Sequence, residues 1–184
     1  MKRFTDINNP EVIETLLHGG TVVLRTDTLY GVLARAADAD AVAKVYALKD
    51  RDEKKSPIVL ICSPDQLFDE PADTIKKMTS EVWPGKVSVI MPSVNAPIWI
   101  RRDNNSVAYR LPANAELRDL IAKTGPLIAP SANPEGYKPA MNIDEAYDYF
   151  GDGVDAYVDG GYVHDDTPSQ LLLVRDDGTV ERLR

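Results

Sequence analysis

The sequence has 184 residues, a formal net charge of −8, 43% hydrophobic residues and 27% charged residues. This length can bury a core and predicts one domain over residues 1–184. The acidic balance argues against a protein that coats nucleic acid through a basic surface. No apolar run reaches the roughly 18 residues that a membrane span needs, and no signal peptide is recognisable at the amino terminus. The single cysteine, Cys62, excludes an internal disulfide framework and predicts a cytoplasmic protein.

Helical and strand-like patterns alternate along the first half of the chain, and a hairpin pattern closes it. This order predicts an α/β domain with a mixed sheet. The predicted helices cover residues 10–18, 38–49, 63–69, 73–83, 114–124 and 142–150, with Asn9, Asp38 or Asp40, Ser63, Asn114 and Asn142 as caps. The predicted strands cover residues 21–25, 57–62, 86–91, 106–111, 126–130 and 154–158, with a strand or turn at 97–100 and a hairpin over 169–182.

Several predicted strands end in polar side chains. Buried hydroxyls and charges are costly unless they bond something, and ligands of α/β proteins bind at the carboxyl ends of strands. Caps, turns and solvated helix ends are the alternative explanation. If the sheet gathers these groups, they form a pocket for a polyanionic ligand that carries an amino or carboxylate group. The groups are Thr26-Asp27-Thr28, Arg110, Ser131 and Asn133, with Lys49 and Arg51 after a helix.

The common catalytic templates are missing from the sequence. It contains no phosphate loop, no dinucleotide fingerprint and no nucleophile elbow. Cys62 lies in an apolar run and is expected to pack rather than react. The two histidines, His18 and His164, predict no metal site. The pattern therefore favours catalysis by positioning and electrostatic stabilisation, as in nucleotidyl transfer.

The same residues resemble the motifs of a known family. Thr26-Asp27-Thr28-Leu29-Tyr30-Gly31 resembles the P-T-[DE]-T-x-Y-G element of the YrdC-like threonylcarbamoyl-AMP synthases. Lys49-Asp50-Arg51 matches their K-x-R motif, and Ser131-Ala132-Asn133 matches their S-x-N motif. Trp83-Pro84-Gly85 and Val107–Pro112 stand in the family's order and approximate spacing. The resemblance extends from about residue 10 to the end of the sequence.

This resemblance implies a twisted open mixed sheet with flanking helices and a concave basic cavity. It also implies the conversion of L-threonine, bicarbonate and ATP into threonylcarbamoyl-AMP and pyrophosphate. ATP would be a substrate, with Mg²⁺ held mainly by its phosphates. The product would serve a separate threonylcarbamoyl transferase complex that modifies adenosine 37 of tRNA, and a contact with RNA is also conceivable for this family.

The resemblance further implies roles for individual residues. Lys49 and Arg51 would be the catalytic cations, because both reaction partners are anionic. Thr26, Tyr30, Arg110 and Ser169 would surround threonine, with Arg110 on its carboxylate. The ATP-binding set would be Lys49, Arg51, Lys55, Ser106, Ser131 and Asn133.

The chain also departs from the family pattern. Arg25 replaces the usual proline before Thr26, and Asp52 follows Arg51 where proline is typical. Lys86-Val87-Ser88 and Ser169-Gln170-Leu171 replace more common triplets. These departures leave other functions open. The alternatives are a carbamoyl-phosphate-dependent adenylating domain like that of hydrogenase-maturation proteins, an RNA-binding module, and a nucleotide-sensing protein without synthase activity.

Overall fold

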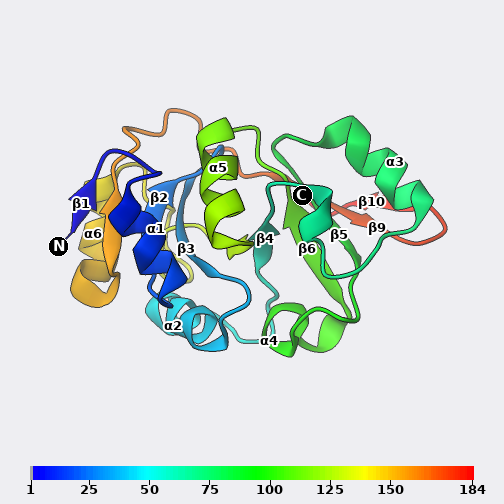
Figure 1. Ribbon diagram of the computed structural model, residues 1–184, viewed down its shortest axis with the longest axis horizontal. Helices are drawn as coiled ribbons and strands as arrows, with labels where there is room; N and C mark the ends of the chain where they lie inside the picture. Colours follow the sequence, from blue (N-terminus) through cyan, green and yellow to red (C-terminus); the bar gives the residue numbers. More distant parts are fainter. Residues whose placement is uncertain (1) are drawn as a thin grey trace.

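The computed structural model describes residues 2–184 and, within them, one mixed sheet of ten strands with helices on both faces (Figure 1). The strand order is β1-β8-β2-β3-β7-β4-β6-β5-β9-β10. The strands are β1 Arg3–Phe4, β2 Val22–Arg25, β3 Tyr30–Arg35, β4 Ile58–Leu60, β5 Val87–Pro92, β6 Ser106–Arg110, β7 Leu127–Ile128, β8 Ala156–Val158, β9 Gln170–Val174 and β10 Val180–Arg182. The helices are α1 Pro10–Leu17, α2 Ala39–Lys49, α3 Asp73–Val82, α4 Ile98–Arg101, α5 Ala115–Thr124 and α6 Ile143–Phe150. The predicted α/β class with a mixed, open sheet is confirmed.

The direction of the strands determines how the sheet can build a site. β8 runs parallel to β1 and β2, β4 runs parallel to β6, and β5 runs parallel to β9. The remaining neighbours, including β2 with β3, β3 with β7 and β7 with β4, are antiparallel. β6 therefore runs opposite to β2. Adjacent strands rotate by roughly 20–25°, so the four steps from β2 to β6 turn these strands steeply across each other.

Alternate side chains of the central strands enter two separate cores. On β2, Val22 and Leu24 pack with α1 and α5, whereas Val23 packs on the other face with residues of α2 and α6. All three side chains have no exposed surface. This period of two is the strand geometry itself, and both faces of β2 are covered by helices. The carboxyl end of β2 is thereby fixed against two packed layers.

The predicted helix caps are largely confirmed. The side-chain oxygens of Asn9, Asp38, Asn114 and Asn142 each accept a hydrogen bond from a backbone N–H in the first turn of the following helix. The helix predicted over residues 63–69 is wrong, because only a single 3₁₀ turn forms at Pro64–Gln66. The residues after it bend away instead of continuing the helix, and the Phe68 N–H donates to the Tyr109 hydroxyl at 3.3 Å.

Other differences concern short or fully buried segments. β3 was not predicted, because its apolar run Tyr30–Arg35 is buried on both faces and shows no alternation. Residues 98–101 form the short helix α4 rather than a strand or turn. Cys62 is a half-buried free thiol that packs against the α1–α5 core, as expected of a packing residue. No helix within residues 2–184 is long and apolar enough to cross a membrane.

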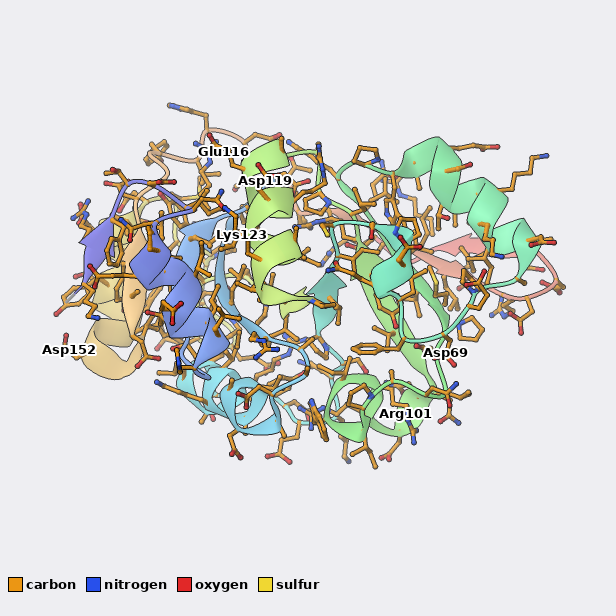
Figure 2. The ribbon with its side chains drawn as sticks, in the orientation of Figure 1. Asp69, Arg101, Glu116, Asp119, Lys123 and Asp152 are labelled. Carbon is orange, nitrogen blue, oxygen red and sulfur yellow. The ribbon has the colours of Figure 1, made fainter. Side chains whose placement is uncertain are left out.

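The α1–α5 core supports a stability prediction on one helix. Ile121 of α5 has no exposed surface, whereas Asp119 of the same helix is exposed (Figure 2). Ile121→Ala should lower the free energy of unfolding by about 2–5 kcal/mol, because it leaves a cavity in a packed core. Asp119→Ala should change it by less than about 0.5 kcal/mol. Urea denaturation measures both values, and equal values would contradict the assignment of the buried face of α5.

Candidate functional site

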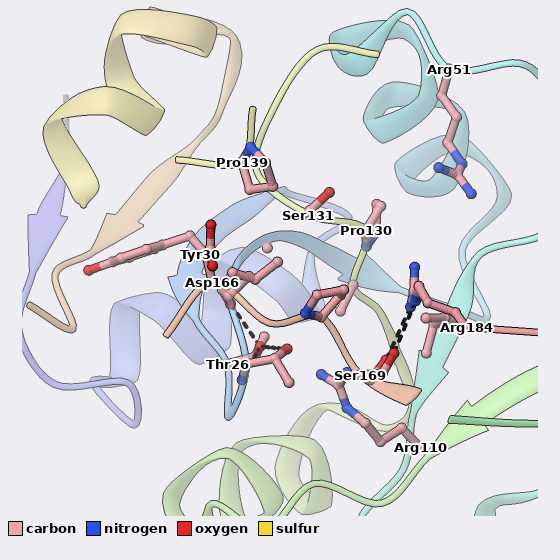
Figure 3. Close-up of a pocket in the computed structure, with 16 residues that line it drawn as sticks. Thr26, Tyr30, Arg51, Arg110, Pro130, Ser131, Pro139, Asp166, Ser169 and Arg184 are labelled. Carbon is pink, nitrogen blue, oxygen red and sulfur yellow. Dashed lines mark hydrogen bonds between the residues drawn. The ribbon is translucent and has the colours of Figure 1, made fainter. Parts of the chain in front are cut away.

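A cavity of about 440 Å³ lies where the β2–β3 turn, the segment after β7, the end of β6 and the start of β9 meet (Figure 3). Its charged lining residues are Arg51, Arg110, Arg184 and Asp166. The polar lining includes Thr26, Tyr30, Ser131 and Ser169. The cavity thus has more cationic than anionic groups in its wall, although the whole chain is acidic.

The turn between β2 and β3 is closed by its own hydroxyl groups. The Thr26 hydroxyl donates to the Leu29 carbonyl at 2.7 Å and accepts from the Thr28 N–H at 3.2 Å. The Thr26 N–H donates to the same carbonyl at 2.9 Å. A threonine at this position therefore shapes the turn from within, and both Thr26 and Thr28 line the cavity.

Arg110 and Asp27 form a buried ion pair beside this turn. Arg110 Nη2 lies 3.1 Å from Asp27 Oδ1, and each side chain is only 5% exposed. Asp27 Oδ2 accepts from the Ala113 N–H at 3.2 Å. Burial lowers the pKa of Arg110, and the Asp27 carboxylate acts in the opposite direction. The Nε atom of Arg110 is buried without a hydrogen-bond partner among the described residues, so the guanidinium keeps donor capacity for a ligand.

Three further side chains complete the wall of the cavity: Ser169, Arg184 and Tyr30. The Ser169 hydroxyl lies 2.9 Å from the Ser88 hydroxyl. Arg184 Nε donates to the Ser169 carbonyl at 3.0 Å, and Arg184 Nη2 donates to the Ser169 hydroxyl at 3.3 Å. Tyr30 lines the cavity with its hydroxyl anchored: it donates to the Gly161 carbonyl at 2.8 Å and accepts from the Gly160 N–H at 2.9 Å.

Lys49 supports the cavity from behind. It is 3% exposed, and its Nζ donates to the carbonyls of Ser131 and Asn133. Ser131 in turn donates from its hydroxyl to Asn133 Oδ1 at 2.6 Å. Desolvation lowers the pKa of Lys49 to about 8, with a smaller contribution in the same direction from Arg51. The end of α2 is thus tied to the loop that follows β7.

Arg51 is the cation from this region that reaches the cavity. Its Nη2 donates to the Ser56 carbonyl at 3.2 Å, and its guanidinium carbon lies 5.5 Å from the centre of the Tyr46 ring. It makes no ion pair with a carboxylate in the described part of the chain, and its buried Nε has no hydrogen-bond partner there. Figure 3 shows its side chain extending from the end of α2 toward the cavity.

A comparison of the sequence with protein families gives one match, over residues 14–184. The family model is that of Sua5, YciO and YrdC, described as telomere recombination. The chain belongs to this Sua5/YciO/YrdC family. Among its curated relatives, the threonylcarbamoyl-AMP synthase of Marinobacter nauticus is 32% identical over 165 residues, which cover 86% of this chain and 87% of the relative.

Two solved structures share the fold. Sua5 of P. abyssi, complexed with L-threonine, is 25% identical with a TM-score of 0.88, and the match covers 100% of this chain and 56% of that one. The chain therefore spans little more than half of the Sua5 length. E. coli YciO has a TM-score of 0.85 at 18% identity, covering 100% of this chain and 93% of YciO, and supports the fold alone.

The structure brings together six of the residues that the family motifs predicted. They come from the turn after β2, the loop after α2, the end of β6, the segment after β7 and the start of β9. Their individual roles remain predictions. The six are Thr26, Tyr30, Arg51, Arg110, Ser131 and Ser169.

Four predicted ATP ligands do not line this cavity. Lys49 and Asn133 lie behind Ser131, as described above. Lys55 forms an ion pair with Glu135. Ser106 begins β6 and pairs in register with Pro92.

Two charged lining residues, Arg184 and Asp166, were missed by the sequence analysis. Arg184 could have been found from the hairpin: antiparallel pairing around the turn near residue 177 returns the chain to Ser169, and the Leu171 N–H donates to the Arg184 carbonyl at 3.1 Å. Asp166 lies in an irregular loop, where no periodic signal marks a side-chain direction.

Breaking the buried ion pair should destabilise the fold. Asp27→Ala leaves the Arg110 guanidinium without its counter-charge and should lower the free energy of unfolding by about 3 kcal/mol. As a control, Lys2→Ala removes an ion pair of 3.4 Å whose side chains are 62% and 63% exposed, and it should cost less than about 1 kcal/mol. Urea denaturation measures the free energy of unfolding of both variants. Equal losses in the two variants would contradict the argument from burial.

The lowered pKa of Lys49 predicts a pH dependence of stability. Between about pH 8 and 10.5, the folded protein has released this proton while the unfolded chain still holds it. Stability therefore rises with pH in this window, by about 1.4 kcal/mol per pH unit from this group. Relative to Lys49→Met, the wild type should gain stability as pH increases from 8 to 10. Parallel stability curves for the two proteins would show that Lys49 titrates normally.

Proposed function

We propose that the protein joins L-threonine, bicarbonate and ATP into threonylcarbamoyl-AMP and releases pyrophosphate, as a nucleotidyltransferase. The observation that carries this proposal is the cavity itself, because it has separate cationic groups on two sides. Arg110 lies beside the β2–β3 turn, and Arg51 lies by the loop after β7. A ligand with two anionic ends, an amino-acid carboxylate and a polyphosphate, matches this arrangement. The names of the curated relatives support the same reaction.

Threonine would bind on the side of the β2–β3 turn. The Arg110 guanidinium would pair with its carboxylate, since Arg110 keeps unused donors and is fixed by Asp27. The Ser169 and Thr26 hydroxyls and the Tyr30 ring would surround the remaining atoms. The threonine complex of P. abyssi Sua5 supports this choice of substrate.

ATP would bind on the side of Ser131 and Arg51. Arg51 would neutralise the phosphates directly, and Lys49 would act by holding the Ser131–Asn133 loop and by its nearby charge. Asn133 would support this site from behind Ser131. Lys55 and Ser106 do not line the cavity, and we assign them to the outer part of this nucleotide site. Mg²⁺ would arrive with the nucleotide on its phosphate oxygens; the described residues contain no group of three metal-binding side chains.

The chemistry follows from this placement. The neutral amine of threonine attacks the carbon of bicarbonate, or of the carbon dioxide formed from it by loss of water. The C–N bond forms, one C–O bond of bicarbonate breaks, and water leaves with the proton that the amine releases, which gives the carbamate. A carbamate oxygen then attacks the α-phosphorus, the bond to the β,γ-phosphates breaks, and pyrophosphate leaves with its electron pair. Fixed cations lower the repulsion between carbamate and phosphate as charge develops. The adenylate would pass, in the cytoplasm, to a threonylcarbamoyl transferase complex acting on adenosine 37 of tRNA.

The decisive test is pyrophosphate release by the purified full chain. Release should require ATP, bicarbonate and L-threonine together, and mass spectrometry should detect the threonylcarbamoyl adenylate. Adenylate formed only from carbamoyl phosphate would favour the hydrogenase-maturation type of reaction. Nucleotide or RNA binding without turnover would favour a sensing or RNA-binding protein, and either result would overturn the proposal.

A substitution in the nucleotide side of the cavity tests the mechanism. Arg51→Ala should lower kcat/KM by roughly a hundredfold, because it removes a fixed charge that faces the developing anion. The matched control is Arg175→Ala, which removes an exposed arginine paired only with Glu181 at 3.4 Å. The control should retain wild-type turnover. Wild-type turnover by Arg51→Ala would remove Arg51 from the mechanism.

A further inference from the structure

We propose that Asp166 binds the α-ammonium group of the amino-acid substrate and so selects amino acids over acids that lack the amine. This inference rests on the proposed function. Asp166 lines the same cavity as Arg110, and it is the one carboxylate among the lining residues. Figure 3 labels Asp166 among the side chains that line the cavity.

The charge pattern of the cavity points to this role. A free amino acid is a zwitterion, so its binding site needs a cation for the carboxylate and an acceptor for the ammonium. Arg110 supplies the first, and the remaining charged lining groups are two arginines and Asp166. Hydroxyls of the β2–β3 turn are already used within the turn. Asp166 is therefore the lining group that matches an ammonium in charge.

The loop that carries Asp166 is anchored on both sides. Val163 has no exposed surface, and its N–H donates to the Met141 carbonyl at 2.8 Å. Ser169 is 2% exposed and bonded to Ser88 and Arg184. Between these anchors the backbone spans only five residues, all of them exposed, and this short span keeps Asp166 at the cavity.

The neighbouring carboxylate of Asp165 has bonding partners, whereas that of Asp166 has none among the described residues. Asp165 Oδ1 accepts from the Thr167 N–H at 3.0 Å, and its Oδ2 pairs with Lys86 at 3.4 Å. Asp166 itself makes no hydrogen bond or ion pair with the described residues. Of two consecutive acids, one closes the loop and the other is left free at the cavity. That difference provides a matched control.

A carboxylate beside an ammonium stabilises the charged amine, which binds but does not attack. The contact therefore strengthens substrate binding and does not assist the attack. Asp166→Asn should raise the KM for L-threonine about fivefold to tenfold, as expected for a charge contact with partial solvent access. Its kcat should stay at the wild-type value or above it.

The test combines kinetics and direct binding with the full-length protein. We would measure KM and kcat for L-threonine in the wild type, Asp166→Asn, Asp166→Glu and Asp165→Asn. Calorimetry would compare L-threonine with 2,3-dihydroxybutanoate, in which a hydroxyl replaces the amine. The inference expects a weaker affinity for threonine alone in Asp166→Asn, partial rescue in Asp166→Glu, and no change in Asp165→Asn.

Three results would overturn the assignment of Asp166. The first is an unchanged KM in Asp166→Asn while the wild type turns over normally, which leaves the proposed function intact. The second is an equal loss of affinity for threonine and the amine-free acid, which indicates a change in loop shape. The third is a wild type that neither binds threonine nor releases pyrophosphate, and this result alone also removes the proposed function.

Discussion

The buried pair of Arg110 and Asp27 is the interaction on which the cavity depends. It joins the end of β6 to the turn after β2, two segments that lie on strands running in opposite directions. Each side chain is 5% exposed, so both charges are largely removed from water. Such a pair contributes little net stability, but either charge alone would be strongly unfavourable. The pair therefore specifies the arrangement of these two segments and leaves the guanidinium oriented toward the cavity.

A second tie fixes the other side of the site. Lys49 donates to two carbonyls of the loop after β7, and the Glu135 N–H donates to the Lys49 carbonyl at 2.7 Å. The end of α2 and this loop thus hold each other in place. Burial lowers the pKa of Lys49 to about 8, and both the charged and the neutral amine have enough N–H donors for the two carbonyls. The two cations of the K-x-R motif consequently point in different directions. Lys49 bonds to the loop behind the cavity wall, and Arg51 lines the cavity.

Much of this could be predicted from the sequence because local signals decide it. The caps at Asn9, Asp38, Asn114 and Asn142 and the polar turn after β2 are set by neighbouring residues. The convergence of Thr26 and Arg110 was a hypothesis about the sheet, and it arises from strand twist rather than from a shared edge. The side-chain direction of Lys49 could not be predicted, since it depends on carbonyls more than 80 residues away. The place of Asp166 at the cavity could not be predicted for the same reason. Its loop is held by tertiary contacts of Val163 and Ser169, and no periodic sequence pattern marks it.

Local charge outweighs the acidic character of the whole molecule at this site. The chain carries a net charge of −8, yet the cavity wall has three arginines and one aspartate. At physiological ionic strength, exposed charges are screened over about 8 Å, whereas charges in a partly buried cavity are screened much less. Surface carboxylates therefore affect how often an anionic ligand arrives more than how it is held. Within the cavity, the Arg110 guanidinium with its free Nε and Arg51, which makes no ion pair with a described carboxylate, provide positive charge, and Asp166 is the one carboxylate in the wall.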